Sequence, residues 1–270
     1  MTDFLPYRLC AIDLDETFLT RDHTISPRNL RAVRAIVQRG VTVVLASGRM
    51  HESILNFATQ CGLNTPIISY NGAMVKNPVT SETWLHDPVM PPDAVRVLDY
   101  CEENDLHLQY YIGGEVLMKS RNQFADLYIG RTDSPYEVIP DFYQTVAPLA
   151  TTKMVIVNTP DGTDTLKPIF VAMLGNSLYI TKTSEEFLEF MSPGVSKGKA
   201  LAKVAQRLGF RAEETIAFGN GQNDIPMIEF AALGVAVSDA RPELLAVADR
   251  IAPGYEEDGV AQVLEEIYGL

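Results

Sequence analysis

Two aspartates separated by one residue follow the first apolar run of the chain. Asp13 and Asp15 come directly after Leu9–Ile12, in the segment Asp13-Leu14-Asp15-Glu16-Thr17. Residues i and i+2 of an extended chain face the same side, so the two carboxylates can converge on one point. Adjacent carboxylates repel each other unless a cation or a shared proton lies between them. The pattern favours a divalent metal site in which one carboxylate also takes part in the chemistry. A strand that ends in a solvated acidic turn is the alternative.

Other predicted strands also end in small, hydroxyl, amide or acidic residues. These ends are Ser47-Gly48-Arg49, Ser69-Tyr70-Asn71-Gly72 and the segment from Gly219 to Asp224. Each segment alone has an ordinary explanation as a turn or a flexible loop. In an open parallel sheet, however, ligands bind outside the carboxyl ends of the strands. Together, the strand ends predict a metal-dependent phosphate site at one edge of a sheet.

The elements that must position these residues alternate between apolar strands and amphipathic helices, which is typical of a parallel sheet with crossover helices. Ser26 followed by Pro27 predicts the start of a helix that ends at Gly40. The other expected elements are strands 8–12, 41–46, 66–69, 215–218 and 235–237, and helices 50–61, 196–208 and 224–230. They form a doubly wound sheet.

The character of the chain changes between these two groups of elements. Short segments at 72–76 and 82–85 resemble hairpin strands, and Gly113-Gly114 predicts a hairpin between 107–111 and 115–119. Helices at 91–104 and 163–174 and strands at 153–157, 178–181 and 187–190 complete an α+β block with an antiparallel sheet. We therefore predict a discontinuous domain, 1–81 with 192–270, that is interrupted by an inserted domain at 82–191.

Composition limits the classes of function. The 270 residues are 46% apolar and carry 22 basic and 35 acidic side chains, a net charge of −13. Nucleic acid and membrane surfaces require basic patches, so we expect neither as a partner. The three cysteines and four histidines show no metal-ligand spacing, and we see neither a signal peptide nor a membrane-spanning segment. We expect a cytoplasmic monomer or small homo-oligomer.

Four segments, in this order, resemble the motifs of haloacid-dehalogenase (HAD) superfamily phosphatases. They are DLDET at 13–17, ASGR at 46–49, SKGKAL at 196–201 and GNGQND at 219–224. With YNGA at 70–73 and the large insert, the chain resembles the Cof-type subfamily (type IIB, with a C2 cap). The resemblance spans the whole chain. It implies an α/β fold with a doubly wound, Rossmann-like core and an inserted α+β cap domain.

The resemblance also implies the catalytic roles. Asp13 would be the nucleophile that forms an aspartyl-phosphate, and Asp15 would protonate the leaving group and then deprotonate the attacking water. The Ser47 hydroxyl, the backbone N–H groups that begin at Gly48 and the Lys197 ammonium would hold the phosphoryl oxygens.

A magnesium site is implied as well. Mg²⁺ would be held by Asp13, the backbone carbonyl of Asp15 and the last motif. In that motif Asn220 stands where the family usually has aspartate, so we expect Asp224 to carry direct or water-mediated ligation, with Asn220 contributing its amide oxygen. Glu16, where the family often has glycine, is interpreted as harmless. The residues expected to support the site are Thr17, Arg49, Asn71 and Asn223.

The function predicted is Mg²⁺-dependent hydrolysis of a small phosphate monoester, such as a sugar phosphate or a phosphorylated cofactor. Alternatives are a phosphotransferase, for instance a sugar phosphomutase, and a non-catalytic regulator that binds a phosphorylated metabolite. The insert would act as a lid that excludes bulk water. Residues of the insert that could contact a substrate are Tyr110, Tyr111, Lys119, Arg121 and Lys153, although packing and a solvated sheet edge are the favoured explanation for them.

Overall fold

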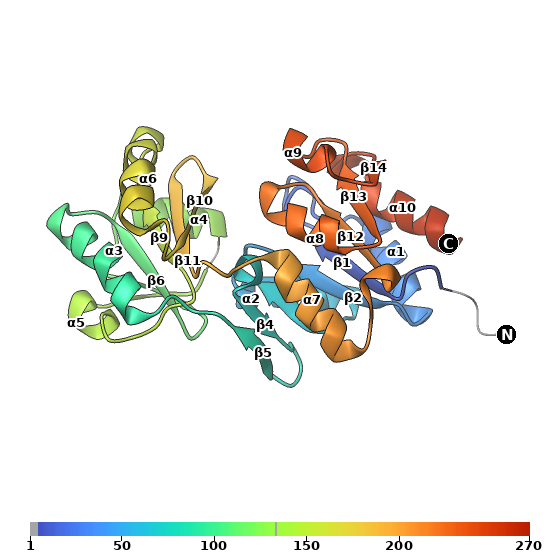
Figure 1. Cartoon of the computed structure of the whole chain (residues 1–270), viewed down its shortest axis with the longest axis horizontal. Coiled ribbons are helices and arrows are strands. Elements are labelled where there is room, and N and C mark those ends of the chain that lie inside the picture. Colours follow the sequence, from blue (N-terminus) through green and yellow to red (C-terminus); the bar gives the residue numbers. More distant parts are fainter. Residues whose placement is uncertain (1–4, 133) are drawn as a thin grey trace. The chain divides into compact units, whose positions relative to one another are not determined.

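A computed structural model describes residues 5–132 and 134–270 (Figure 1). The described residues form two compact units. The first contains the residues up to Leu85 together with Ser196–Leu270, and the second is His86–Val195. None of the helices within 5–132 and 134–270 has both the length and the apolar character needed to cross a membrane.

The first unit is built on one sheet with the strand order β14-β13-β12-β1-β2-β3-β4-β5. The pairs from β14 to β3 are parallel, and β4 is antiparallel to β3. The strands are β1 (Leu9–Asp13), β2 (Thr42–Ala46), β3 (Ile67–Ser69), β4 (Met74–Lys76), β5 (Thr83–His86), β12 (Thr215–Gly219), β13 (Leu233–Val237) and β14 (Arg250–Ala252). Its helices are α1 (Pro27–Gln38), α2 (His51–Cys61), α7 (Lys197–Leu208), α8 (Ile225–Phe230), α9 (Pro242–Leu245) and α10 (Gly259–Tyr268).

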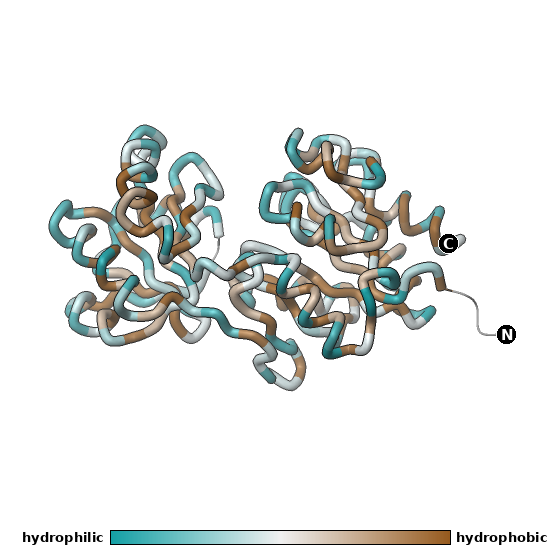
Figure 2. Tube along the Cα trace, viewed as in Figure 1, coloured by the Kyte–Doolittle hydropathy of each residue, from teal (hydrophilic) through white to brown (hydrophobic). Residues whose placement is uncertain are grey.

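Alternate residues of the central strand β1 face two separate apolar cores. Cys10 and Ile12 pack with α1, α2 and α10, whereas Leu9 and Ala11 pack with α7 and α8. The sheet is therefore covered by helices on both faces. Apolar residues run along the strands and the inward sides of the helices, and the loops are more polar (Figure 2).

Local signals in the sequence explain where the main helices begin and end. The Ser26 hydroxyl accepts a hydrogen bond from Asn29 N (3.0 Å), and Pro27 occupies the first turn of α1. Ser196 caps α7 in the same way, through Lys199 N (3.4 Å). Helix α7 ends at Gly209, whose φ of 76° is a left-handed conformation that glycine adopts without strain.

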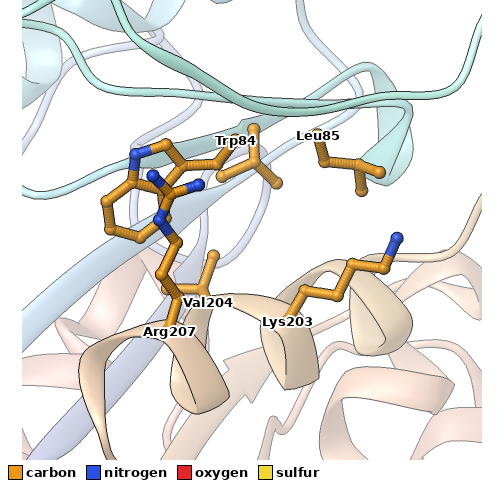
Figure 3. A pocket seen from close by; sticks show the side chains of 6 residues that line it. Trp84, Leu85, Lys203, Val204 and Arg207 are labelled. Carbon is orange, nitrogen blue, oxygen red and sulfur yellow. The ribbon is translucent and has the colours of Figure 1, made fainter.

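The outermost strand of the first sheet, β5, is stabilised by contacts with α7. The Arg207 guanidinium lies over the Trp84 ring, 4.3 Å from its centroid (Figure 3). The Trp84 indole N–H donates to Glu82 Oε2 at 3.1 Å. Because β5 joins this sheet, the first unit continues to Leu85, a few residues beyond the boundary that the sequence suggests at 81. The second unit likewise ends at Val195, a few residues after the suggested boundary at 191.

The second unit contains a sheet with the order β10-β11-β9-β6-β7-β8, antiparallel except for the β7–β8 pair. Its strands are β6 (Leu108–Ile112), β7 (Glu115–Met118), β8 (Tyr136–Val138), β9 (Met154–Val157), β10 (Tyr179–Ser184) and β11 (Phe187–Met191). Its helices are α3 (Pro91–Glu103), α4 (Gln123–Thr132), α5 (Phe142–Val146) and α6 (Pro160–Leu174). Apolar side chains of α3 and α6 share a core with Tyr110, Met154 and Phe190. The predicted α/β class, with a doubly wound core and an α+β insert, is confirmed.

Candidate active site

The carboxyl ends of adjacent strands bring the predicted residues to one edge of the first sheet. β1 lies between β2 and β12 in parallel register. Asp13 is the last residue of β1, Ser47 directly follows β2, and Gly219 is the last residue of β12. Asn71 lies in the short 3₁₀ turn after β3. This arrangement is the one expected of a ligand site in an open parallel sheet.

A buried lysine joins two aspartates at this edge. The Lys197 ammonium lies 2.6 Å from Asp13 Oδ1 and 2.6 Å from Asp224 Oδ1. Lys197 is 1% exposed, Asp13 4% and Asp224 0%. Lys197 is the first residue of α7, so the helix start places its side chain at the strand ends.

Burial and neighbouring charges set the protonation of this cluster. Burial raises the pKa of Asp13 to about 7, and the nearby Asp224 carboxylate adds to the increase, against the lowering effect of Lys197. Burial disfavours the charged form of Lys197, but the two carboxylates hold its pKa above the ordinary value. Two buried carboxylates thus face one ammonium, and a further positive charge beside them would be stabilised.

Asp15 contacts a separate set of side chains. Arg49 Nε donates to Asp15 Oδ2 at 2.9 Å and Arg49 Nη2 donates to Oδ1, while His23 Nδ1 lies 3.5 Å from Oδ1. Burial alone would raise the pKa of Asp15, but the hydrogen bonds and charge of Arg49, together with His23, hold it below the ordinary value. In this state Asp15 is ionised.

The loops after β2, β3 and β12 contact one another through Asn71. Asn223 Nδ2 donates to Asn71 Oδ1 at 2.8 Å. A Cβ at Gly48 would lie 2.9 Å from the same oxygen, so glycine is needed for this approach. The Ser47 hydroxyl, in a buried residue, accepts from Arg49 N at 3.1 Å. The structure therefore brings Ser47, Gly48, Asn71 and Asn223 together.

Thr17 lies in the loop after β1 and is fully buried. Its backbone N–H donates to Leu14 O at 3.3 Å. Its hydroxyl has no hydrogen-bond partner among the residues that the structure describes. A role for Thr17 in ordering this loop stays a prediction.

The contacts of the last motif centre on Asp224. Asp224 Oδ2 accepts from the backbone N–H groups of Asn220 (3.0 Å) and Gly221 (2.9 Å), and Oδ1 accepts from Lys197. Both Asp224 oxygens therefore already have donors. The Asn220 amide donates from Nδ2 to Glu16 Oε2 at 3.3 Å. Glu16, to which sequence analysis gave no role, thus lies at the site. The signal that could have identified it was an acidic residue inside the first motif.

The donor chemistry of this edge fits Mg²⁺. Carboxylate, amide and carbonyl oxygens are hard ligands, and Mg²⁺ is commonly held by one or two carboxylates while it keeps several waters. Within the described part of the chain no group of three His, Cys, Asp or Glu side chains is arranged to hold a metal ion. A Mg²⁺ site with fewer carboxylates would need the Asn220 amide oxygen and the Asp15 carbonyl as further ligands.

The candidate substrate contacts of the insert separate into two groups. Tyr111 and Lys153 meet in a buried cluster, where the Lys153 ammonium lies 2.8 Å from Glu189 Oε1 and 5.0 Å from the centre of the Tyr111 ring. The others have local partners: Tyr110 donates to Leu149 O (2.8 Å), Lys119 pairs with Glu102 (2.7 Å) and Arg121 pairs with Asp126 (2.6 Å). Packing therefore explains Tyr110, and surface ion pairs explain Lys119 and Arg121.

Comparison with known proteins gives a second line of evidence, independent of the geometry of the site. Residues 10–264 match the family of haloacid dehalogenase-like hydrolases. Phosphatase YwpJ of Bacillus subtilis is 26% identical, over 96% of this chain and 99% of its own length. The 5-amino-6-(5-phospho-D-ribitylamino)uracil phosphatase YitU of the same organism is 28% identical, over 98% of both chains.

Solved structures agree with these sequence matches. The crystal structure of TM0651 from Thermotoga maritima is 31% identical and has a TM-score of 0.90, covering 96% of this chain and 97% of that one. The resemblance that the four motifs indicate is thus confirmed over nearly the full length. The chain belongs to the haloacid dehalogenase-like hydrolase family.

Proposed function

We propose that this protein is a Mg²⁺-dependent phosphatase that hydrolyses a small phosphate monoester through an aspartyl-phosphate on Asp13. The observation that carries the proposal is the buried Lys197 ammonium, 2.6 Å from both Asp13 and Asp224 at the carboxyl edge of the sheet. Family membership and the relatives named as phosphatases support it.

Asp13 performs the first displacement. A carboxylate oxygen of Asp13 attacks phosphorus, the ester P–O bond breaks, and its electron pair goes to the leaving oxygen. Asp15 gives this oxygen a proton, so an alcohol leaves and an acyl phosphate remains on Asp13. Covalent catalysis divides one slow displacement into two easier ones.

Water then completes the reaction. A water oxygen attacks the phosphorus of the aspartyl-phosphate while Asp15, now ionised, takes the proton of the water. The bond between phosphorus and the Asp13 oxygen breaks and inorganic phosphate forms, which leaves Asp13 as a carboxylate and Asp15 protonated. Asp15 releases this proton to solvent when its pair with Arg49 forms again, and it takes up a proton when the next substrate binds.

Asp15 must be protonated for the first step, although Arg49 keeps it ionised in the structure. A phosphate dianion bound beside Arg49 would compete for the guanidinium and place negative charge next to Asp15. Both effects raise the pKa of Asp15. Substrate binding would thus prepare the acid, and the Asp15–Arg49 pair would keep it ionised between turnovers.

The residues around phosphate have positioning and electrostatic roles. Lys197 places a positive charge beside Asp13, and the Ser47 hydroxyl and nearby N–H groups offer donors to the phosphoryl oxygens. Mg²⁺, held by Asp13, the Asp15 carbonyl and Asn220, would neutralise negative charge on the phosphate. The partner proposed is a small phosphorylated metabolite, since a net charge of −13 does not suit nucleic acid or membrane.

The test is a screen of phosphate monoesters with Mg²⁺, in which release of inorganic phosphate is measured. Sugar phosphates and phosphorylated cofactors belong in the screen, as does the phosphorylated ribitylamino-uracil for which YitU is named. We expect release by the native protein and none by Asp13→Asn. Mass spectrometry of acid-quenched reactions should detect phosphate on the peptide that contains Asp13.

Two results would contradict the proposal. Full turnover by Asp13→Asn would remove Asp13 from the nucleophilic role. Transfer of the phosphoryl group between positions of a sugar, without net release of phosphate, would identify a phosphomutase.

A further inference from the structure

The acidic residues at the carboxyl edge differ in the cations that they contact. Asp13 and Asp224 share Lys197, and Asp15 pairs with Arg49. Glu16 is the exception: among the residues that the structure describes, no Lys, Arg or His side chain forms an ion pair with it. Glu16 is exposed, and it contacts the last motif through Asn220.

The contact between Glu16 and Asn220 fixes the orientation of an amide. Asn220 Nδ2 donates to Glu16 Oε2 at 3.3 Å, so the Asn220 carbonyl oxygen is the end turned away from Glu16. A carboxylate that accepts from a ligand residue orients that ligand and makes its donor atom more electron-rich. Asn220 itself is neutral, and Glu16 places a negative charge directly behind it.

The backbone at Glu16 is unusual. Its φ of 53° lies in the left-handed region, which costs a residue with a Cβ about 1–2 kcal/mol. Glycine would adopt this conformation without that cost. The strained position presents the carboxylate next to Asn220, and strain of this kind is concentrated at functional sites.

We propose that Glu16 is a positioning residue of the Mg²⁺ site: it turns the Asn220 amide oxygen toward the metal and supplies the negative charge that Asn220 lacks. Asp224 then orders the loop and Lys197, since its two oxygens accept hydrogen bonds from Lys197, Asn220 and Gly221. The inference rests on the proposed function, since it concerns the same metal site.

The first test measures Mg²⁺ affinity of the free protein by isothermal titration calorimetry, with Mn²⁺ binding followed by EPR as a second probe. Glu16→Gln keeps an acceptor oxygen but removes the charge, and we expect it to weaken binding by about tenfold or more. Glu213→Gln is the matched control, because Glu213 is exposed and precedes β12 at the opposite edge of the sheet. Its affinity should equal that of the native protein.

The second test places the charge at position 220. Asn220→Asp supplies its own carboxylate, and Glu16 then faces it as a like charge. In the Asn220→Asp background, Glu16→Gln should increase Mg²⁺ affinity, the reverse of its effect in the native background. A role for Glu16 in loop structure alone would give the same loss in both backgrounds.

Separate outcomes decide the inference and the function. Unchanged affinity in Glu16→Gln, or an equal loss in both backgrounds, would overturn the role of Glu16 even if Asp13→Asn abolishes phosphate release. If no phosphate ester is hydrolysed but the effect of Glu16→Gln reverses between backgrounds, the role of Glu16 at the metal site is supported and the proposed reaction is contradicted. Circular dichroism should show that Glu16→Gln is folded, as expected for an exposed side chain.

Discussion

Lys197 is the residue on which the charge balance of the site depends. Its ammonium is the cation that contacts both Asp13 and Asp224, and all three groups are nearly inaccessible to solvent. Without it, two buried carboxylates would face each other with little solvent to screen their repulsion. The same ammonium lies beside the proposed nucleophile, so we expect both stability and catalysis to depend on it.

Replacement of Lys197 by methionine should therefore reduce both properties. Loss of one partner of a buried ion pair costs about 3–5 kcal/mol, and we expect a fall of this order in the free energy of unfolding. Phosphate release should fall by about 10²-fold or more, because a preorganised positive charge is lost. Urea denaturation followed by Trp84 fluorescence and steady-state kinetics measure the two effects.

Lys203→Met is the control for this prediction. Lys203 is on the same helix but exposed, so its replacement should change both quantities little. Native turnover by Lys197→Met would show that the ammonium does not assist the reaction.

The types of residue at the site could be predicted from sequence, but their pairings could not. The motifs identify Asp13 and Lys197 because each motif keeps a fixed order of residue types. The Asp224 contacts depend on how the loop folds back, so that Oδ2 reaches the N–H groups of Asn220 and Gly221. The contact between Asn220 and Glu16 joins residues far apart in the chain, and no local pattern encodes it.

At the scale of elements, the position of α7 depends on a close contact with α8. Gly198 is the second residue of α7, and a Cβ added there would lie 2.1 Å from the Pro226 carbonyl oxygen. Only glycine permits this approach. Since Lys197 is the adjacent residue, the helix contact also sets the position of the site ammonium.

Gly198→Ala should therefore damage the site without changing any charged group. The clash requires a shift of α7 or α8, which we expect to cost about 1–3 kcal/mol of stability and to lower kcat. Thermal denaturation and kinetics measure these effects. Gly130→Ala in α4 is the control, because open space surrounds that glycine and alanine favours helix by about 1 kcal/mol. Equal behaviour of the two variants would contradict the packing argument.

The predictability of an element depended on its burial pattern. The apolar run 41–46 predicts a buried strand, and β2 is Thr42–Ala46. β8 was missed because all three of its residues are exposed and show no alternation. α10 was missed although Asp258, a residue type that often precedes a helix, stands directly before it. The Asp258 carboxylate accepts from the Ser26 hydroxyl and makes no side-chain cap on α10.

At the scale of the molecule, the second unit has the features of an independently folding domain. It is continuous in sequence, from His86 to Val195, and contains its own apolar core. Its two ends are joined locally, because the Ser192 hydroxyl donates to Asp87 Oδ1 at 2.9 Å. The bridge between Val89 and Thr151 ties a third segment to the same region. The first unit, in contrast, is made of two separate parts of the chain.

We therefore expect the fragment 86–195 to fold alone. About 100 residues is a common domain size, and this segment does not need the first unit to complete its sheet. Far-UV circular dichroism should show a cooperative thermal transition, and NMR should show dispersed amide signals. Trp84, the one tryptophan of the sequence, lies in the first unit, so its fluorescence in the intact protein reports unfolding of that unit separately. A fragment without a cooperative transition would show that this core is too small to offset the conformational entropy of its own chain.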